Sequence, residues 1–185
     1  MIVGRRVALR SIEEDDLKAL RDWRNREDMR RFFREYRELN MANQKAWFDG
    51  TVNGGSRDLM VAIVDRGSGE LIGAAGLCSI DWVVRNAEIS LYIGKDGLYV
   101  DQGPDGFAWD ALSLLVGYGF RQVNLHKVWA EVFEIDLAKQ RLLEEFGFRR
   151  DGVLRDKGFT DGAYLSSIVY SFLENEWQRV GRDQS

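Results

Sequence analysis

The chain has 185 residues, 45% hydrophobic and 30% charged content, and a formal net charge of −4. These values describe one globular domain with a sizeable core, and they give no reason to expect nucleic acid or an anionic membrane as a partner. One cysteine excludes an internal disulfide, and the sequence shows no cluster of metal ligands. No apolar run approaches the ~20 residues that span a bilayer, and the N-terminus lacks the apolar segment of a signal peptide. We therefore expect a cytoplasmic protein without a metal.

The first part of the chain predicts a strand followed by helices. Ser11, with Glu13 and Glu14 behind it, has the pattern of an N-cap and an acidic first turn. The expected elements are a strand at residues 7–10, a helix that begins after Ser11, a second helix at residues 28–36 and a third at residues 40–48.

The rest of the chain predicts strands that alternate with two helices. Turn signals separate the apolar runs, at residues 65–69 and at Asp161-Gly162. The expected strands cover residues 59–64, 71–78, 85–93, 128–133, 152–155 and 164–173, and the expected helices cover residues 107–120 and 137–146. We expect residues 1–177 to form a single domain and residues 178–185 to be a polar tail that frays.

The segment between residues 87 and 148 suggests an anion site. A strand runs through a loop that carries Gly103 and Gly106 into the N-terminus of a helix. Backbone N–H groups and the positive end of the helix dipole converge at such a place. A second strand and a second short helix, ending at Gly147-Phe148, leave room beside it for a long, phosphate-bearing cofactor.

This order of elements resembles the GNAT family of N-acetyltransferases, most closely the branch with ribosomal-protein N-terminal and spermidine acetyltransferases. Six segments carry the resemblance: LR…DLKALRDWRN, AEISLYIG, GFAWDALSLLVGYGF, NLHKVWAEV, LLEEFGFRRDGVLRD and DGAYLSSIVYSFL. The resemblance implies a single-domain α/β fold with a mixed, mainly antiparallel, twisted sheet, helices on both faces and a splay between two parallel strands. Dimers are common in the family, so a homodimer is one expectation.

The resemblance implies that acetyl-CoA is the acyl donor and that its pantetheine arm lies in the splay. Strand backbone would pair with the arm, and loop and helix groups would hold the phosphates. The residues carried over for this role are Leu91, Tyr92, Ile93, Gly103, Gly106, Phe107, Ala108, Asp136 and Lys139.

The phosphate loop departs from the family pattern at Pro104 and Asp105. Proline has no N–H to donate, and an aspartate beside a pyrophosphate is unfavourable unless it turns away. The loop from residues 95 to 103 is also longer than usual. Pro104 would alternatively be the first helical residue, with Asp105 complementing the helix dipole in a site without ligand.

Transfer of an acetyl group requires a base that accepts the proton of the amine. The resemblance implies Glu88 for this role, directly or through water; the alternative is a strand carboxylate paired with Arg or Lys. In the helix at residues 137–146, Asp136 takes the position of a family Asn and Leu143 that of a Tyr proposed as general acid, so we name no general acid. Lys139 would approach a phosphate or would be an exposed helix lysine.

The acceptor is a small-molecule or peptide amine, and the N-terminal helices and last hairpin would form its pocket. The residues that would line it are Phe33, Arg34, Trp47, Trp82 and Tyr164. Arg30, Arg34 and Arg37 fall on one face of the predicted helix, which indicates either ion pairs with nearby glutamates or a site for an anionic acceptor such as a nucleotide-linked amino sugar. A non-catalytic acyl-CoA-binding or regulatory protein is the alternative to an enzyme.

Overall fold

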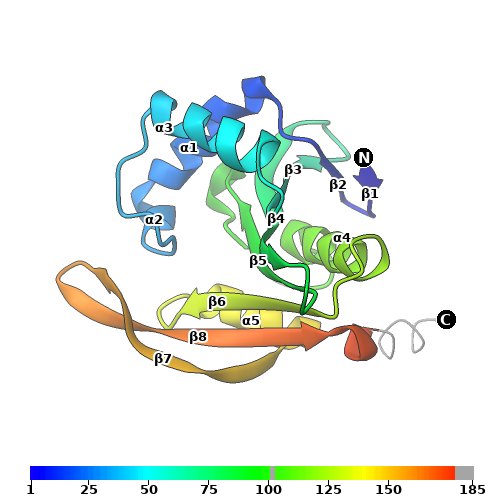
Figure 1. Cartoon of the computed structure of the whole chain (residues 1–185). Helices are drawn as coiled ribbons and strands as arrows, with labels where there is room; N and C mark the ends of the chain where they lie inside the picture. Colours follow the sequence, from blue (N-terminus) through cyan, green and yellow to red (C-terminus); the bar gives the residue numbers. More distant parts are fainter. Residues whose placement is uncertain (101–102, 178–185) are drawn as a thin grey trace.

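A computed structural model describes residues 1–100 and 103–177 and shows an eight-stranded sheet within them (Figure 1). The strand order is β1-β2-β3-β4-β5-β6-β8-β7. The strands are β1 (Ile2–Val3), β2 (Val7–Arg10), β3 (Leu59–Asp65), β4 (Leu71–Asp81), β5 (Asn86–Ile93), β6 (Lys127–Phe133), β7 (Arg149–Thr160) and β8 (Ala163–Leu173). The mixed, mainly antiparallel sheet that the resemblance implies is confirmed.

Helices cover both faces of this sheet. They are α1 (Leu17–Asn25), α2 (Glu27–Arg30), α3 (Met41–Trp47), α4 (Phe107–Arg121) and α5 (Leu137–Phe146), with short turns at Glu14–Asp16, Phe48–Asn53 and Lys95–Gly97. Tyr92 in β5 donates from its hydroxyl to the Leu20 carbonyl of α1 at 3.5 Å, whereas Gly119 of α4 lies against Leu77 and Val128. No helix among the described residues is long and apolar enough to cross a membrane.

The sheet opens between β5 and β6, the one parallel pair among the described strands. Pairing runs from Asn86↔Lys127 to Glu88↔Trp129 and then stops, although β5 continues to Ile93 and β6 to Phe133. Beyond Glu88, β6, β8 and β7 diverge from β1–β5 as a separate arm (Figure 1). The predicted splay is therefore present, and it leaves polar backbone groups along one edge of β5.

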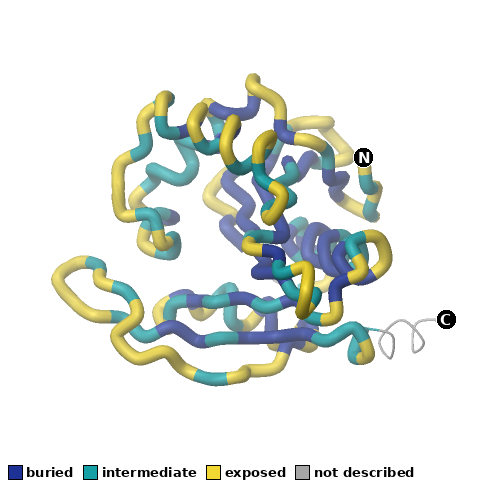
Figure 2. Tube along the Cα trace, in the orientation of Figure 1, coloured by how far each residue is buried: buried dark blue, intermediate teal, exposed yellow. Residues whose placement is uncertain are grey.

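The core lies on both faces of the central strands, under α4 and α5 as well as under α1, and the exposed segments lie mainly on the outer turns and on the β7–β8 hairpin (Figure 2). A close approach at the end of β5 fixes α1 against the sheet: a Cβ on Gly94 would lie 2.1 Å from the Trp23 ring. A side chain at this position would push α1 away from the strand that carries Glu88, so the glycine helps to hold the two elements together.

Three local predictions are wrong. Ser11 is not the cap of a helix: Glu13 precedes the first turn, and its N–H donates to the Asp16 carboxylate at 2.9 Å. The second helix ends at Arg30 rather than at residue 36, because aromatic side chains beyond it turn into the core. Phe32 stacks on Tyr99 at 4.7 Å and Phe33 meets the edge of Tyr92 at 5.4 Å.

Pro104 is not the first residue of the helix. Gly106 is the N-cap of α4, with extended φ and ψ of −76° and 157°, and the helix begins at Phe107. The backbone before it is held by the N-terminal strands instead: Arg5 donates to the Pro104 carbonyl and Arg6 to the Asp105 carbonyl. These tertiary contacts replace the helical hydrogen bonds that the sequence pattern suggests.

Candidate active site in the strand splay

Glu88 lies at the last parallel pair of β5 and β6, where the splay begins. Its side chain is 10% exposed and accepts a hydrogen bond from the Arg34 guanidinium. The same guanidinium lies 3.9 Å from Oε2 of Glu131 in β6. The structure thus brings two carboxylates and one cation together at the mouth of the splay.

Glu131 was missed by the sequence analysis. Its side chain is 7% exposed, and its Oε1 is buried with no hydrogen-bond partner in the described part of the chain. The alternation of KVWAEVF, with Val128, Ala130 and Val132 buried on one face, places Glu131 on the opposite face with Trp129. Since Trp129 pairs with Glu88, that alternation would have placed Glu131 beside the candidate base.

The edge of β5 in the splay already has partners from the chain itself. The Ile93 N–H donates to the Tyr99 carbonyl at 2.7 Å, and the Leu91 carbonyl accepts from the Lys139 ammonium at 2.9 Å. Tyr92 pairs with Ala74 of β4 and points its backbone away from the splay. Of the three strand residues predicted to bind the cofactor, Leu91 and Ile93 therefore present their backbone to the splay.

Lys139 is neither at the phosphate loop nor exposed. Its ammonium reaches across the splay from α5, lies 5.7 Å from the centre of the Tyr99 ring, and has its pKa lowered by burial. Asp136 is the N-cap of α5: it accepts from the Lys139 N–H at 3.1 Å and from the Tyr99 hydroxyl. Burial first, and then Asp136, raise the pKa of Tyr99 well above its ordinary value. The hydrogen bond between Tyr99 and Asp136 therefore joins α5 to the loop that covers the edge of β5.

The residues predicted to bind phosphate lie at the N-terminus of α4 and in the turn before it. Gly106 and Ala108 are buried there, and Gly103 adopts a positive φ of 84°, which favours glycine. Asp105 turns outward and forms an ion pair with Arg5 at 2.9 Å. This pairing removes the objection to an aspartate beside a phosphate.

Arg6 is a second cation at this loop, and neither arginine was singled out from the sequence. Its guanidinium lies 3.8 Å from the centre of the Phe107 ring. Asp110, one turn into α4, accepts from the backbone N–H groups of Arg6 and Val7 at 2.7 and 2.9 Å. The hydrogen bonds between Asp110 of α4 and the backbone at Arg6 and Val7 therefore bring two positive side chains to the loop. No local sequence pattern predicts this long-range contact.

A cleft of about 1590 Å³ lies between the segment after α1 and the β7–β8 hairpin. Phe33 and Arg34 line the side formed by the segment after α1, while Lys157 and Phe159 line the side formed by the hairpin. The cleft leads to Glu88 through Arg34. Among the predicted acceptor residues, the structure brings Phe33 and Arg34 together at this point.

The other predicted acceptor residues lie elsewhere. Trp47 packs partly buried against the core, and Trp82, on the β4–β5 turn, donates from its indole N–H to the Ser56 carbonyl at 3.1 Å. Tyr164 is 67% exposed and meets the edge of Phe159, a cleft residue, at 5.1 Å. Aromatic character alone did not distinguish core, turn and cleft positions.

The arginine face predicted for residues 28–36 does not exist, because the helix ends at Arg30. Each arginine has a separate carboxylate partner: Arg30 pairs with Glu38 at 2.6 Å, Arg37 with Glu35 at 2.8 Å, and Arg34 with Glu88. Arg30 and Arg37 form the expected ion pairs with nearby glutamates, whereas Arg34 pairs with a carboxylate of β5 that is distant in the sequence.

Comparison with known proteins identifies the family. The family model of the acetyltransferase (GNAT) domain matches residues 6–149, so the chain belongs to the GNAT family. The uncharacterized N-acetyltransferase YoaA of Bacillus subtilis (strain 168) is 28% identical over 171 residues, which cover 91% of this chain and 94% of that protein. A spermidine N(1)-acetyltransferase of Vibrio cholerae is 25% identical over 158 residues, covering 85% of this chain and 87% of that protein.

Solved structures support the same fold. The spermidine N-acetyltransferase from Vibrio cholerae, in complex with CoA and spermine, has a TM-score of 0.84 at 23% identity and covers 94% of this chain and 98% of its own. A GNAT-family acetyltransferase from Bacillus anthracis has a TM-score of 0.78 at 19% identity and covers 95% and 99%. The chain is an acetyl-CoA-dependent N-acetyltransferase.

Proposed function

We propose that this chain transfers an acetyl group from acetyl-CoA to a primary amine that enters through the cleft, with Glu88 as the base. The observation that carries the proposal is the position of Glu88: it lies at the mouth of the splay, on the face toward the cleft, beside a guanidinium that reaches it from the cleft. A carboxylate within reach of both substrates can accept the proton of the attacking amine.

The residues of the splay fit acetyl-CoA, which supplies the activated acetyl group. Leu91 and Ile93 present backbone groups that an amide-bearing arm would pair with: the Ile93 N–H in exchange for the Tyr99 carbonyl, and the Leu91 carbonyl beside the Lys139 ammonium. Gly103 lies in the turn before α4, and Gly106, Phe107 and Ala108 form the start of the helix, where a phosphate is favoured by the helix dipole. Arg5 and Arg6 add positive charge to the same loop.

Proton transfer in this site depends on Glu88 rather than on an acid from α5. Leu143, at the position of the family Tyr, is 2% exposed in the core and has no proton to give. The Lys139 ammonium is the cation that α5 directs into the splay, and its bond to the Leu91 carbonyl would place it beside the arm of the cofactor rather than at a phosphate. Asp136 holds Lys139 and Tyr99 in place.

A small cationic amine is the acceptor class that the cleft favours. Relatives named spermidine N(1)-acetyltransferase belong to this class by name. An anionic acceptor, such as a nucleotide-linked amino sugar, is the weaker candidate, because Arg30, Arg34 and Arg37 are paired with carboxylates and Arg31, which also lines the cleft, packs over the Phe32 ring. A peptide amine is the second candidate for the acceptor. A homodimer in the cytoplasm is a separate proposal, and size-exclusion chromatography with light scattering would test the oligomeric state.

Calorimetry with acetyl-CoA tests the cofactor site and separates an enzyme from a protein that no longer binds the donor. We expect micromolar binding that Gly106→Asp abolishes, because the new carboxylate would lie beside the phosphates. Gly152→Asp is the matched control, since a Cβ at Gly152 meets no atom within 4 Å. Failure of the wild-type chain to bind at millimolar acetyl-CoA would overturn the assignment, whereas binding without turnover on any amine would favour the regulatory alternative.

A further inference from the structure

Glu88 and Glu131 form a buried pair of carboxylates on one face of the sheet. They come from adjacent parallel strands, and Glu131 lies two residues beyond Trp129, the register partner of Glu88. The side chain of Glu88 is 10% exposed and that of Glu131 is 7% exposed. Burying a carboxylate is unfavourable unless a cation or hydrogen-bond donors compensate for the lost water. A pair of them therefore needs a cation between or beside them.

Arg34 is that cation, but it compensates only one of the two carboxylates fully. Its guanidinium hydrogen-bonds to Glu88 but remains 3.9 Å from Oε2 of Glu131, and the buried Oε1 of Glu131 has no hydrogen-bond partner among the described residues. Within the chain as described, no other Lys or Arg lies within salt-bridge distance of either carboxylate. Oε1 of Glu131 is therefore a hydrogen-bond acceptor that Arg34 does not use.

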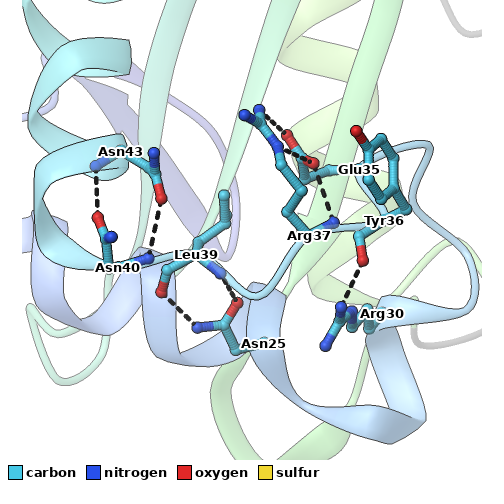
Figure 3. A network of polar contacts seen from close by, with 8 residues as sticks. All are labelled: Asn25, Arg30, Glu35, Tyr36, Arg37, Leu39, Asn40 and Asn43. Atoms are coloured by element: carbon cyan, nitrogen blue, oxygen red, sulfur yellow. Dashed lines mark hydrogen bonds and ion pairs between the residues drawn. The ribbon is translucent and has the colours of Figure 1, made fainter.

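The segment that carries Arg34 is anchored on both sides of it, but Arg34 itself is not buried. Figure 3 shows the anchors: Arg30 donates to the Tyr36 carbonyl, Asn25 and Leu39 exchange two hydrogen bonds of 2.8 and 2.9 Å, and Asn40 caps α3. The Arg34 side chain is 52% exposed and lines the cleft. Its guanidinium can therefore turn into solvent while the backbone of the segment stays in place.

We infer that Glu88 and Glu131 form the seat of the acceptor's ammonium group, and that Arg34 occupies this seat until an acceptor replaces it. A guanidinium and an alkylammonium both present N–H donors and a positive charge to carboxylates. An ammonium is smaller, so it can lie between the carboxylates and donate to both, including Oε1 of Glu131. This inference rests on the proposed function and adds a specificity-determining residue, Glu131, to it.

The two carboxylates have different roles in this arrangement. Glu88 accepts one proton from the bound ammonium, which leaves a neutral amine to attack the thioester carbonyl. Glu131 stays ionised and holds the acceptor in place, so it discriminates in favour of amines that arrive charged. An aromatic amine, which is neutral at the pH of the assay, loses this attraction and would be a poor acceptor.

Binding of n-propylamine to the full chain without acetyl-CoA tests the seat directly, because no reaction takes place. By NMR titration we expect Glu131→Gln to weaken binding about tenfold or more, since a charged hydrogen bond is lost. Arg34→Ala removes the competing cation and is expected to tighten binding about fivefold or more, the scale of a weak ion pair. 1-Propanol, which carries no charge, is expected to show no binding to either variant.

Matched controls come from the same segments. Glu134→Gln keeps the oxygen that accepts from the Ser166 N–H, and Arg37→Ala removes an arginine that pairs with Glu35 instead. Both are expected to bind propylamine as the wild type does. Equal affinities for wild type, Glu131→Gln and Arg34→Ala would overturn the seat, and so would a complete lack of binding to Arg34→Ala.

Steady-state kinetics separates this inference from the proposed function. If propylamine is acetylated, Glu131→Gln should raise KM for the amine with little change in kcat, because Glu131 binds but takes no proton. An active enzyme whose KM does not respond to Glu131→Gln would overturn the seat alone. A chain that binds propylamine through Glu131 but never acetylates an amine would overturn the proposed function and leave the seat standing.

Discussion

On the cofactor side of the splay, Lys139 reaches the Leu91 carbonyl from a regular helix, whereas on the acceptor side Arg34 reaches Glu88 from an irregular segment. Both cations belong to the chain and both lie beside the place where a substrate would bind. They differ in burial: the Lys139 ammonium is enclosed enough for burial to lower its pKa, while the Arg34 side chain is half exposed. The enclosed cation is built into the site, and the exposed one can be displaced.

The largest effect is expected from the acceptor side, at the base. Glu88→Gln should reduce kcat/KM for an amine by about 10²–10⁴-fold, the usual contribution of a general base. Binding of acetyl-CoA should be unchanged, because Glu88 lies at the mouth of the splay, where its carboxylate bonds to Arg34. Thiol release and calorimetry measure the two quantities. Near-normal turnover of Glu88→Gln would show that another group accepts the proton.

A large stability effect is expected on the cofactor side instead. Asp136 is 2% exposed, caps α5 and accepts from Tyr99, so Asp136→Ala should lower the free energy of unfolding by about 2–4 kcal/mol. Urea denaturation measures the change. Asp136→Asn, which keeps a cap and an acceptor oxygen, should lose clearly less, and equal losses for the two variants would contradict the role given to the hydrogen bonds.

Removal of the enclosed cation should weaken the donor site. Lys139→Met keeps the length of the side chain but loses the ammonium, and acetyl-CoA should bind about tenfold more weakly because one charged hydrogen bond is gone. Isothermal titration at neutral pH measures this. An unchanged affinity would mean that the ammonium leaves the splay when the cofactor binds.

The pH dependence of binding sharpens the same point. Burial lowers the pKa of Lys139 below its ordinary value of 10.5, so the charged donor is lost, as pH rises, earlier than an exposed lysine would lose it. Wild-type affinity for acetyl-CoA should therefore fall at alkaline pH. Lys139→Met should show a flatter profile, and parallel profiles for the two proteins would contradict the assignment.

The smallest effect is expected for the exposed cation. Arg34→Ala should change the free energy of unfolding by only about 0–1 kcal/mol, because the guanidinium is half exposed in the cleft and its removal lets water reach the two carboxylates that it covers. Thermal or urea unfolding of Arg34→Ala and Asp136→Ala under the same conditions measures the two changes in unfolding free energy. A loss as large as that of Asp136→Ala would show that Arg34 is a structural residue rather than a displaceable one.

Prediction from the sequence worked best where the signal was local. The strands at β3, β5, β6 and β8 and the helices α4 and α5 were predicted within a few residues, because apolar periodicity and turn residues lie in the same short window. Prediction failed where a tertiary contact overrides the local pattern. The helix after Asp28 ends early because Phe32 and Phe33 stack on Tyr99 and Tyr92.

The sequence by itself determined the order of the elements, the family and a candidate base, since periodicity, caps and segment order are properties of the chain alone. Only the tertiary structure decided what each charged side chain meets. Glu131 becomes the neighbour of Glu88, and Lys139 that of Leu91, because β5, β6 and α5 converge at one splay. Charges far apart in the chain have no common pattern in the sequence, so their pairing depends on which strands fold side by side.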